Sequence, residues 1–97
     1  MDTELVLSKL RDHEAELNAL GVARLFLFGS VARREARPDS DVDIFFDTEN
    51  PRFSLIELVD VQQQVSGILG TRSDVMTRDS LHPMLRPRIE AEAVRVF

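Results

Sequence analysis

Phe28-Gly29-Ser30 and, after ten further residues, Asp41-Val42-Asp43 decide the fold that this sequence predicts. An apolar run that ends at Phe28 predicts a buried strand over residues 23–28. Gly29 permits a tight turn, and Ser30 can cap the short helix that follows it. Because Pro38-Asp39-Ser40 is typical of a turn, a second strand over 41–46 opens with two carboxylates.

Helices and short strands alternate along the rest of the chain. The other expected elements are a helix over 2–20, a helix over 53–69, a strand over 72–77, a helix over 81–92 that restarts at Pro87, and a strand over 94–97. The alternation indicates an α/β protein, with one sheet and helices packed against it. In the second strand Val42, Ile44 and Phe46 are predicted to face the core. In the helix over 53–69 the predicted inward positions are Leu55, Leu58 or Val59, Gln62, Val65 and Leu69.

Length and composition bound the kind of protein. Ninety-seven residues, 43% of them hydrophobic, predict a single domain over 1–97 with a thin core. No apolar stretch is long enough for a membrane span, and neither a secretion signal nor cysteine is present, so we expect a cytoplasmic protein. A net charge of −5 argues against stable nucleic-acid binding. Phe45, Phe53 and Val61 are expected at the surface, where they would favour a homo-oligomer or a complex.

Asp41 and Asp43 are the strongest chemical signal. Alternate residues of a strand share a face, so the two carboxylates lie about 6.6 Å apart along the backbone and can converge on a metal ion. Mg²⁺ prefers a few carboxylates together with water and substrate phosphates, and two such ions would steady an in-line displacement. The alternative is a solvated face of an edge strand, which the glycine turn directly upstream disfavours.

Gly29, Ser30 and Arg33 form the candidate phosphate-binding turn. Backbone N–H groups between a strand and a helix bind anions, and glycine lets a phosphate approach them closely. Arg33 lies one helical turn beyond Ser30 and can reach the same phosphates. The alternatives are a plain helix cap for Ser30 and a surface role for Arg33.

Asp74 is the candidate third acid. It lies at the start of the third strand, which can pair beside Asp41 and Asp43. There it could act as a general base or tie the attacking hydroxyl to a metal ion; an exposed acid without a role is the alternative. Asp47, Asp60 and Asp79 are expected to be surface residues.

These three motifs together resemble the minimal nucleotidyltransferases of the polymerase-β-like superfamily. The resemblance covers the chain from about Leu25 to the C-terminus, and it implies a small mixed sheet flanked by helices, like a polymerase palm. It also implies that the turn at Gly29 and Ser30 binds ATP and that Asp41, Asp43 and Asp74 bind Mg²⁺. Many members have glycine directly after the motif arginine, where this chain has Arg34.

The same resemblance implies a protein partner. Members of this family often pair with a small helical HEPN-type toxin, onto a tyrosine of which the nucleotidyltransferase, as antitoxin, transfers AMP. The small size of the chain also favours an acceptor that is supplied by another protein. Two other functions stay open: a non-catalytic antitoxin that neutralises its partner by binding alone, and transfer to a small molecule or an RNA end.

Overall fold

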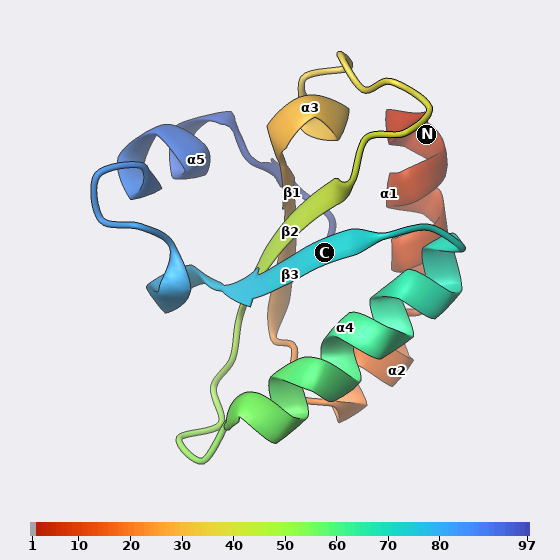
Figure 1. Cartoon of the computed structure of the whole chain (residues 1–97). Coiled ribbons are helices and arrows are strands. Elements are labelled where there is room, and N and C mark those ends of the chain that lie inside the picture. Colours follow the sequence, from red (N-terminus) through yellow and green to blue (C-terminus); the bar gives the residue numbers. More distant parts are fainter. Residues whose placement is uncertain (1) are drawn as a thin grey trace.

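The computed structural model describes residues 2–97 and shows one sheet with helices on both of its faces (Figure 1). The elements are α1 (Thr3–Asp12), α2 (Glu14–Ala19), β1 (Arg24–Phe28), α3 (Gly29–Ala32), β2 (Val42–Asp47), α4 (Leu55–Leu69), β3 (Ser73–Thr77), the 3₁₀ helix η1 (Arg78–Ser80), α5 (Arg86–Glu92) and β4 (Val94–Arg95). The strand order is β3-β2-β1-β4, with β2 and β3 parallel and the other pairs antiparallel. The predicted α/β class and small mixed sheet are therefore confirmed.

The register of the strands fixes which residues lie together. Phe28 at the end of β1 is opposite Asp43 of β2, and Asp43 is opposite Asp74 of β3. The prediction that the third strand pairs beside the second is confirmed. Since residues in register on neighbouring strands share a face, Phe28, Asp43 and Asp74 all belong to the same side of the sheet.

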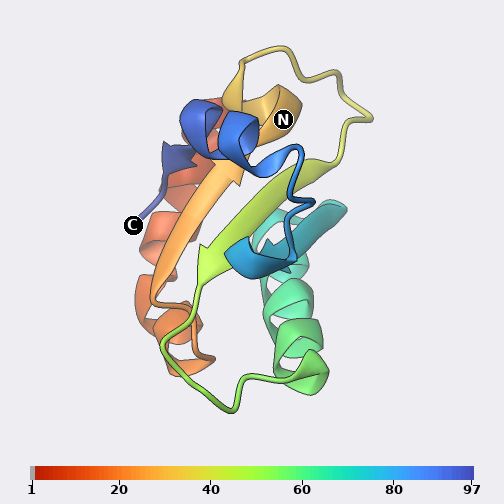
Figure 2. The ribbon, with the colours of Figure 1, turned by 90° about the vertical axis from the view of Figure 1, so that its left-hand side faces the viewer.

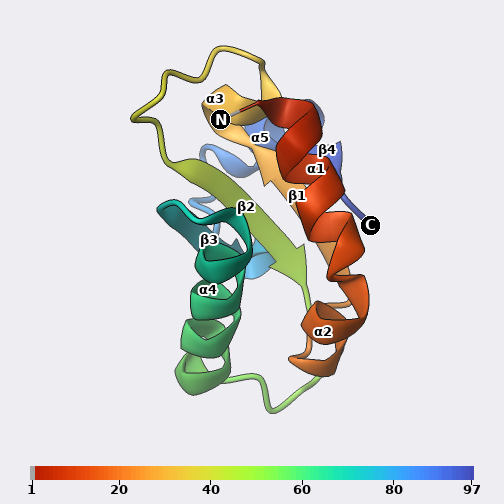
Figure 3. The same cartoon turned by 90° about the vertical axis from the view of Figure 1, so that its right-hand side faces the viewer.

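The other side of the sheet packs against α1, α2 and α4, which lie side by side across it (Figure 3). Val42, Ile44 and Phe46 of β2 are fully buried there, as predicted. Leu25 and Leu27 of β1 are buried on the same face, because they alternate with residues that point to the opposite face. This is the main core of the described chain.

A second, smaller core lies on the opposite side, beneath η1 and α5 (Figure 2). Phe26 and Phe45 stack with their ring centroids 4.9 Å apart, and Phe45 is fully buried. The Arg78 guanidinium lies 4.8 Å from the centroid of Phe26 and 5.0 Å from that of Phe45. Arg78 also forms ion pairs with Asp47 at 2.7 Å and with Glu90 of α5 at 2.5 Å. Through Arg78, α5 is tied to the sheet.

Several details of the predicted helices were wrong. The expected helix over 2–20 is divided at His13 into α1 and α2. In α4 the buried residues are Val61, Val65 and Leu69, whereas Leu55 and Gln62 are exposed. Spacings of four set this buried stripe, whereas Leu55 lies six residues before it, in the first turn of α4, and Gln62 lies about 100° around the helix from Val61. The restart at Pro87 is confirmed, since Pro87 lies in the first turn of α5.

The surface positions were also predicted incorrectly in part. Phe45 and Val61 are fully buried, which removes two of the three residues on which the expected homo-oligomer rested. Asp47 is the last residue of β2 rather than a free surface acid, and it pairs with Arg24 and Arg78. Within residues 2–97, no helix has the length and apolar character needed to cross a membrane.

We predict that the ion pairs of Asp47 stabilise the fold in a pH-dependent way. Burial by itself raises the pKa of Asp47, but the hydrogen bonds from Arg78 and Arg24 outweigh burial and hold this pKa below its ordinary value. The ionised carboxylate is therefore favoured by folding. Its contribution is complete above the unfolded-state pKa of about 4 and is lost as the pH falls through the lower folded-state pKa.

Replacing Asp47→Asn should accordingly lower the free energy of unfolding at pH 7 by about 1–3 kcal/mol. The difference from the wild type should shrink towards pH 3. Urea unfolding at both pH values measures it, with Asp60→Asn, at an exposed position in α4, as the matched control. A loss that is equal at pH 7 and pH 3 would contradict this assignment of the charge.

Candidate functional site

The predicted acids gather at one end of the sheet, next to the turn that follows β1. Asp43 and Asp74 are register partners on β2 and β3, and Asp41 lies immediately before β2. Asp43 is half-buried, while Asp41 and Asp74 are exposed. Neighbouring strands are only about 4.8 Å apart, so Asp43 and Asp74 form a like-charge pair.

The electrostatics of Asp43 reflect this crowding. Burial raises the pKa of Asp43, and the charges of Asp74 and Asp41 raise it further, against a weaker opposing effect of Arg33. The folded chain therefore holds a carboxylate whose negative charge is not fully compensated by its surroundings. A bound cation would supply the missing compensation.

The donor set suits Mg²⁺, because carboxylate oxygens are the ligands that this ion prefers. In residues 2–97, no three His, Cys, Asp or Glu side chains converge closely enough to enclose a metal ion by themselves. Asp43 lines one hollow, whereas Asp41 and Asp74 line another of about 160 Å³. Any metal site here would thus be completed by ligands from outside the chain, such as the phosphates of a nucleotide.

Gly29 is required by both the backbone and the space around it. Its φ of +74° lies in the left-handed region that glycine adopts readily. A Cβ on Gly29 would collide with Oδ2 of Asp43 and lie 3.1 Å from its Cγ. The absence of a side chain at this turn is therefore what leaves room for the Asp43 carboxylate.

The turn opens into a hollow of about 340 Å³. On one side it is lined by Phe28, Gly29, Ser30, Arg33 and Asp43, and on the other by α5 residues and Leu85 just before them. Its volume is at the lower end of the range for small-molecule sites. A larger hollow of about 400 Å³ lies between the start of α1 and residues 34–38, but none of the predicted acids lines it.

Arg33 lines the 340 Å³ hollow and pairs with two carboxylates. Its Nε lies 3.1 Å from Oε2 of Glu35, and its Nη1 lies 3.2 Å from Oε1 of Glu92 on α5. The hydrogen bond with Glu35 raises the pKa of Arg33 most, and the charge of Glu92 adds to this effect. Arg33 is thus placed beside the predicted phosphate turn, with part of its charge already balanced.

Ser30 and Arg34 differ from what the sequence suggested. The cap position of α3 is Phe28, and Ser30 lies inside the helix instead of capping it with its side chain. Arg34 has φ +60°, the left-handed conformation that explains why glycine is common after the motif arginine. Arg34 keeps this conformation while pairing with Glu4 of α1.

Four further residues of the hollow were not predicted from the sequence. They are Leu85, Arg88, Ile89 and Glu92. They come from a segment more than 40 residues away from Asp43, and no spacing in the sequence shows that α5 folds back over the end of β1. The three-dimensional structure shows them, because Ile89 packs on the second core that includes Phe28 and Phe45 and so brings α5 to the hollow.

The fold and the acidic end of the sheet define the class of nucleotidyl-transferring palms, and the comparisons agree. Residues 7–96 match the model of the nucleotidyltransferase domain, and the chain belongs to this family. It is 42% identical over 77 residues to a protein of Methanocaldococcus jannaschii with the provisional name protein adenylyltransferase MJ0435, covering 79% of this chain and 82% of the relative. It is 35% identical to the protein adenylyltransferase MntA of Thermococcus cleftensis, covering 96% and 94% of the two chains.

Solved structures show the same fold. One, provisionally described as a minimal nucleotidyltransferase, is 34% identical with a TM-score of 0.83 and covers 97% of this chain and 95% of its own. A chain in a structure of a tri-AMPylated Shewanella oneidensis HEPN toxin in complex with MNT antitoxin matches with a TM-score of 0.68 and 16% identity, over 98% of this chain and 71% of the other chain. A toxin–antitoxin structure with AMP-PNP matches with a TM-score of 0.72 and 17% identity, over 90% and 72%. These two likenesses concern the fold.

We predict that Gly29→Ala destabilises the chain and displaces the Asp43 carboxylate. The left-handed backbone and the collision with Oδ2 together should lower the free energy of unfolding by about 1–3 kcal/mol. Gly67→Ala is the matched control, because a Cβ there meets nothing within 4 Å and α4 favours alanine. Chemical denaturation would contradict the interpretation if the two variants were equally stable.

We also predict that Asp43→Asn stabilises the chain in metal-free buffer. The substitution removes a half-buried charge that Asp74 and Asp41 repel. The gain should be of the order of 1 kcal/mol or less, since the site is partly open to solvent. The midpoint of thermal unfolding in EDTA measures it against Asp60→Asn; a lower midpoint for Asp43→Asn would show that the repulsion does not strain the fold.

Proposed function

We propose that this nucleotidyltransferase is a Mg²⁺-dependent protein adenylyltransferase. In this proposal it moves AMP from ATP onto a tyrosine hydroxyl of a HEPN-type toxin, and it thereby acts as an antitoxin in the cytoplasm, with 1–97 as a single domain. The observation that carries the proposal is the strand register that sets Asp43 opposite Asp74 and directly beside Gly29. It brings the candidate metal ligands to the candidate phosphate turn.

Each predicted site residue has a role in this proposal. Gly29, Ser30 and Arg33 would hold the triphosphate, since all three line the same hollow as Asp43. Asp41, Asp43 and Asp74 would hold Mg²⁺, which when bound neutralises phosphate charge and polarises the reacting phosphoryl group. Asp74 is exposed at the edge of the site, where it can accept the proton of an incoming hydroxyl.

The proposed transfer is a displacement at the α-phosphorus of ATP. The acceptor oxygen forms a bond to the α-phosphorus of ATP, the bond from that phosphorus to pyrophosphate breaks, and the hydroxyl proton leaves to Asp74 or to water. The chain contributes orientation and charge placement to this displacement. No oxidant or reductant is needed.

A protein acceptor is supported by two independent points. The similar relatives carry the name protein adenylyltransferase, and they align with most of this chain. In addition, the hollow of about 340 Å³ is at the lower end of the range for small-molecule sites, so it would leave little room for a second small substrate beside a nucleotide. An acceptor that reaches the site from another protein fits these dimensions best.

The second candidate function is neutralisation of the partner by binding alone. The two are separated by Asp43→Asn, which should lower transfer by about a hundredfold or more and leave partner binding unchanged. Wild-type chain, Asp43→Asn and the control Asp60→Asn would be incubated with Mg²⁺, α-labelled ATP, GTP, CTP or UTP, and lysate of the source cell. We expect label from ATP on one protein, with the wild type and the control only.

Mass spectrometry of the labelled protein would then identify the modified side chain, which we expect to be tyrosine. Absence of transfer with every nucleotide, despite a folded chain and a bound partner, would contradict catalysis and favour binding alone. Label on RNA or on a small molecule would contradict the protein acceptor.

A further inference from the structure

We propose that Arg88 of α5 binds the triphosphate from the wall of the hollow that faces the turn at Gly29. This assignment rests on the proposed function and adds to it a binding residue outside the three motifs. It also gives α5 a direct role in recognising the nucleotide, as well as its role in covering the sheet.

The charges around the hollow single out Arg88. The charged side chains that line it are Arg33, Asp43, Arg88 and Glu92. Arg33 is paired with Glu92 and Glu35, so part of its charge is already balanced within the chain. The Arg88 side chain, by contrast, has no ion pair or hydrogen bond to any other described residue, 2–97. A polyanion entering the hollow therefore meets its uncommitted positive charge at Arg88.

The surroundings of Arg88 favour phosphate binding. Phe28, Leu85 and Ile89 supply apolar surface to the same hollow. A guanidinium is weakly hydrated and presents a planar set of donors, so it pairs well with phosphate next to apolar groups. The negative charge of Glu92 on the same wall would repel a phosphate. A cation such as Arg88 on this wall would offset that repulsion.

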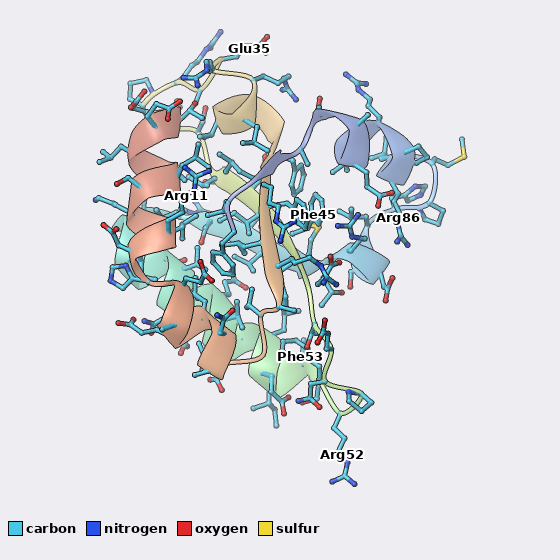
Figure 4. The ribbon with its side chains drawn as sticks, turned by 180° about the vertical axis from the view of Figure 1, so that it is seen from behind. Arg11, Glu35, Phe45, Arg52, Phe53 and Arg86 are labelled. Carbon is cyan, nitrogen blue, oxygen red and sulfur yellow. The ribbon has the colours of Figure 1, made fainter. Side chains whose placement is uncertain are left out.

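The position of Arg88 is also fixed by the packing of α5. Ile89 and Ala93 pack on the second core with Phe28 and Phe45. Glu90 receives ion pairs from Arg78 at 2.5 Å and from Arg86 at 3.3 Å. Figure 4 shows Arg86 on the side of the molecule where α5 lies. Arg88 thus projects from an anchored helix, and less of its freedom is lost when it binds a ligand.

The test measures equilibrium binding of ATP and of inorganic tripolyphosphate, both with Mg²⁺, to the wild type, Arg88→Gln and Arg88→Lys. We expect Arg88→Gln to lower the affinity for both ligands by about tenfold, because one charge-assisted contact is lost. Arg88→Lys should restore part of this affinity. Arg52→Gln is the matched control, because Arg52 is exposed and lies at the far end of the molecule from α5 (Figure 4). Its affinities should equal those of the wild type.

The remaining outcomes are each decisive. Unchanged ATP binding by Arg88→Gln would overturn the assignment. It would do so even if transfer to protein fell, because Arg88 would then contact the acceptor protein and not the nucleotide. Weaker ATP binding with unchanged tripolyphosphate binding would overturn it as well, since Arg88 would then contact the nucleoside. If the wild type bound neither ligand, the proposed function itself would fail. This failure is distinguishable from failure of the Arg88 assignment, because it is seen in the wild type and not in a variant.

Discussion

The partial burial of the Asp43 carboxylate next to two other acids is the constraint on which the site depends. Parallel pairing of β2 with β3 places these two carboxylates opposite each other, and Asp41 adds a third negative charge at the same end. A fold selected only for stability would gain by removing one of them. In the proposed function, a ligand that carries positive charge to this end of the sheet would account for their joint presence. The unfavourable charge of the free chain and the proposed binding of a metal–nucleotide complex would then have the same origin.

The face of the sheet that carries the second, smaller core holds both the candidate site and the structure that supports it. Asp43 and Asp74 lie at one end of this face, Phe26 and Phe45 in the middle, and Asp47 at the other end. The Arg78 network ties α5 to the sheet, and α5 in turn forms one wall of the hollow. Changes to Arg78, at the other end of this face from the acids, should therefore alter the candidate nucleotide pocket through the position of α5. The main core on the opposite face is separate from the chemistry.

Much of this arrangement could be predicted from the sequence because local signals agreed with one another. The apolar run before Gly29, the turn at Pro38 and the alternation from Asp41 to Phe46 each predict their own element, and together they bring the candidate residues to one place. The sequence also allowed the third strand, near whose start Asp74 lies, to be predicted to pair beside β2, and the structure confirms this pairing.

What could not be predicted depends on long-range packing. The inward face of α4 was misjudged because Leu55 is apolar yet lies beyond the stripe that Val61 and Val65 form against the core. Asp47 was expected to be free because its partner Arg78 is 31 residues away. The α5 wall with Arg88 and Glu92 was missed for the same reason, since nothing local shows where that helix folds back.

The most direct test of the central claim is the binding of Mn²⁺, as a spectroscopic substitute for Mg²⁺, measured by electron paramagnetic resonance with and without a non-hydrolysable ATP analogue. We expect weak Mn²⁺ binding to the chain alone and much tighter binding once the nucleotide supplies the remaining ligands. Mn²⁺ binding that the nucleotide does not strengthen, or that persists undiminished in the double variant Asp41→Asn/Asp43→Asn, would contradict it.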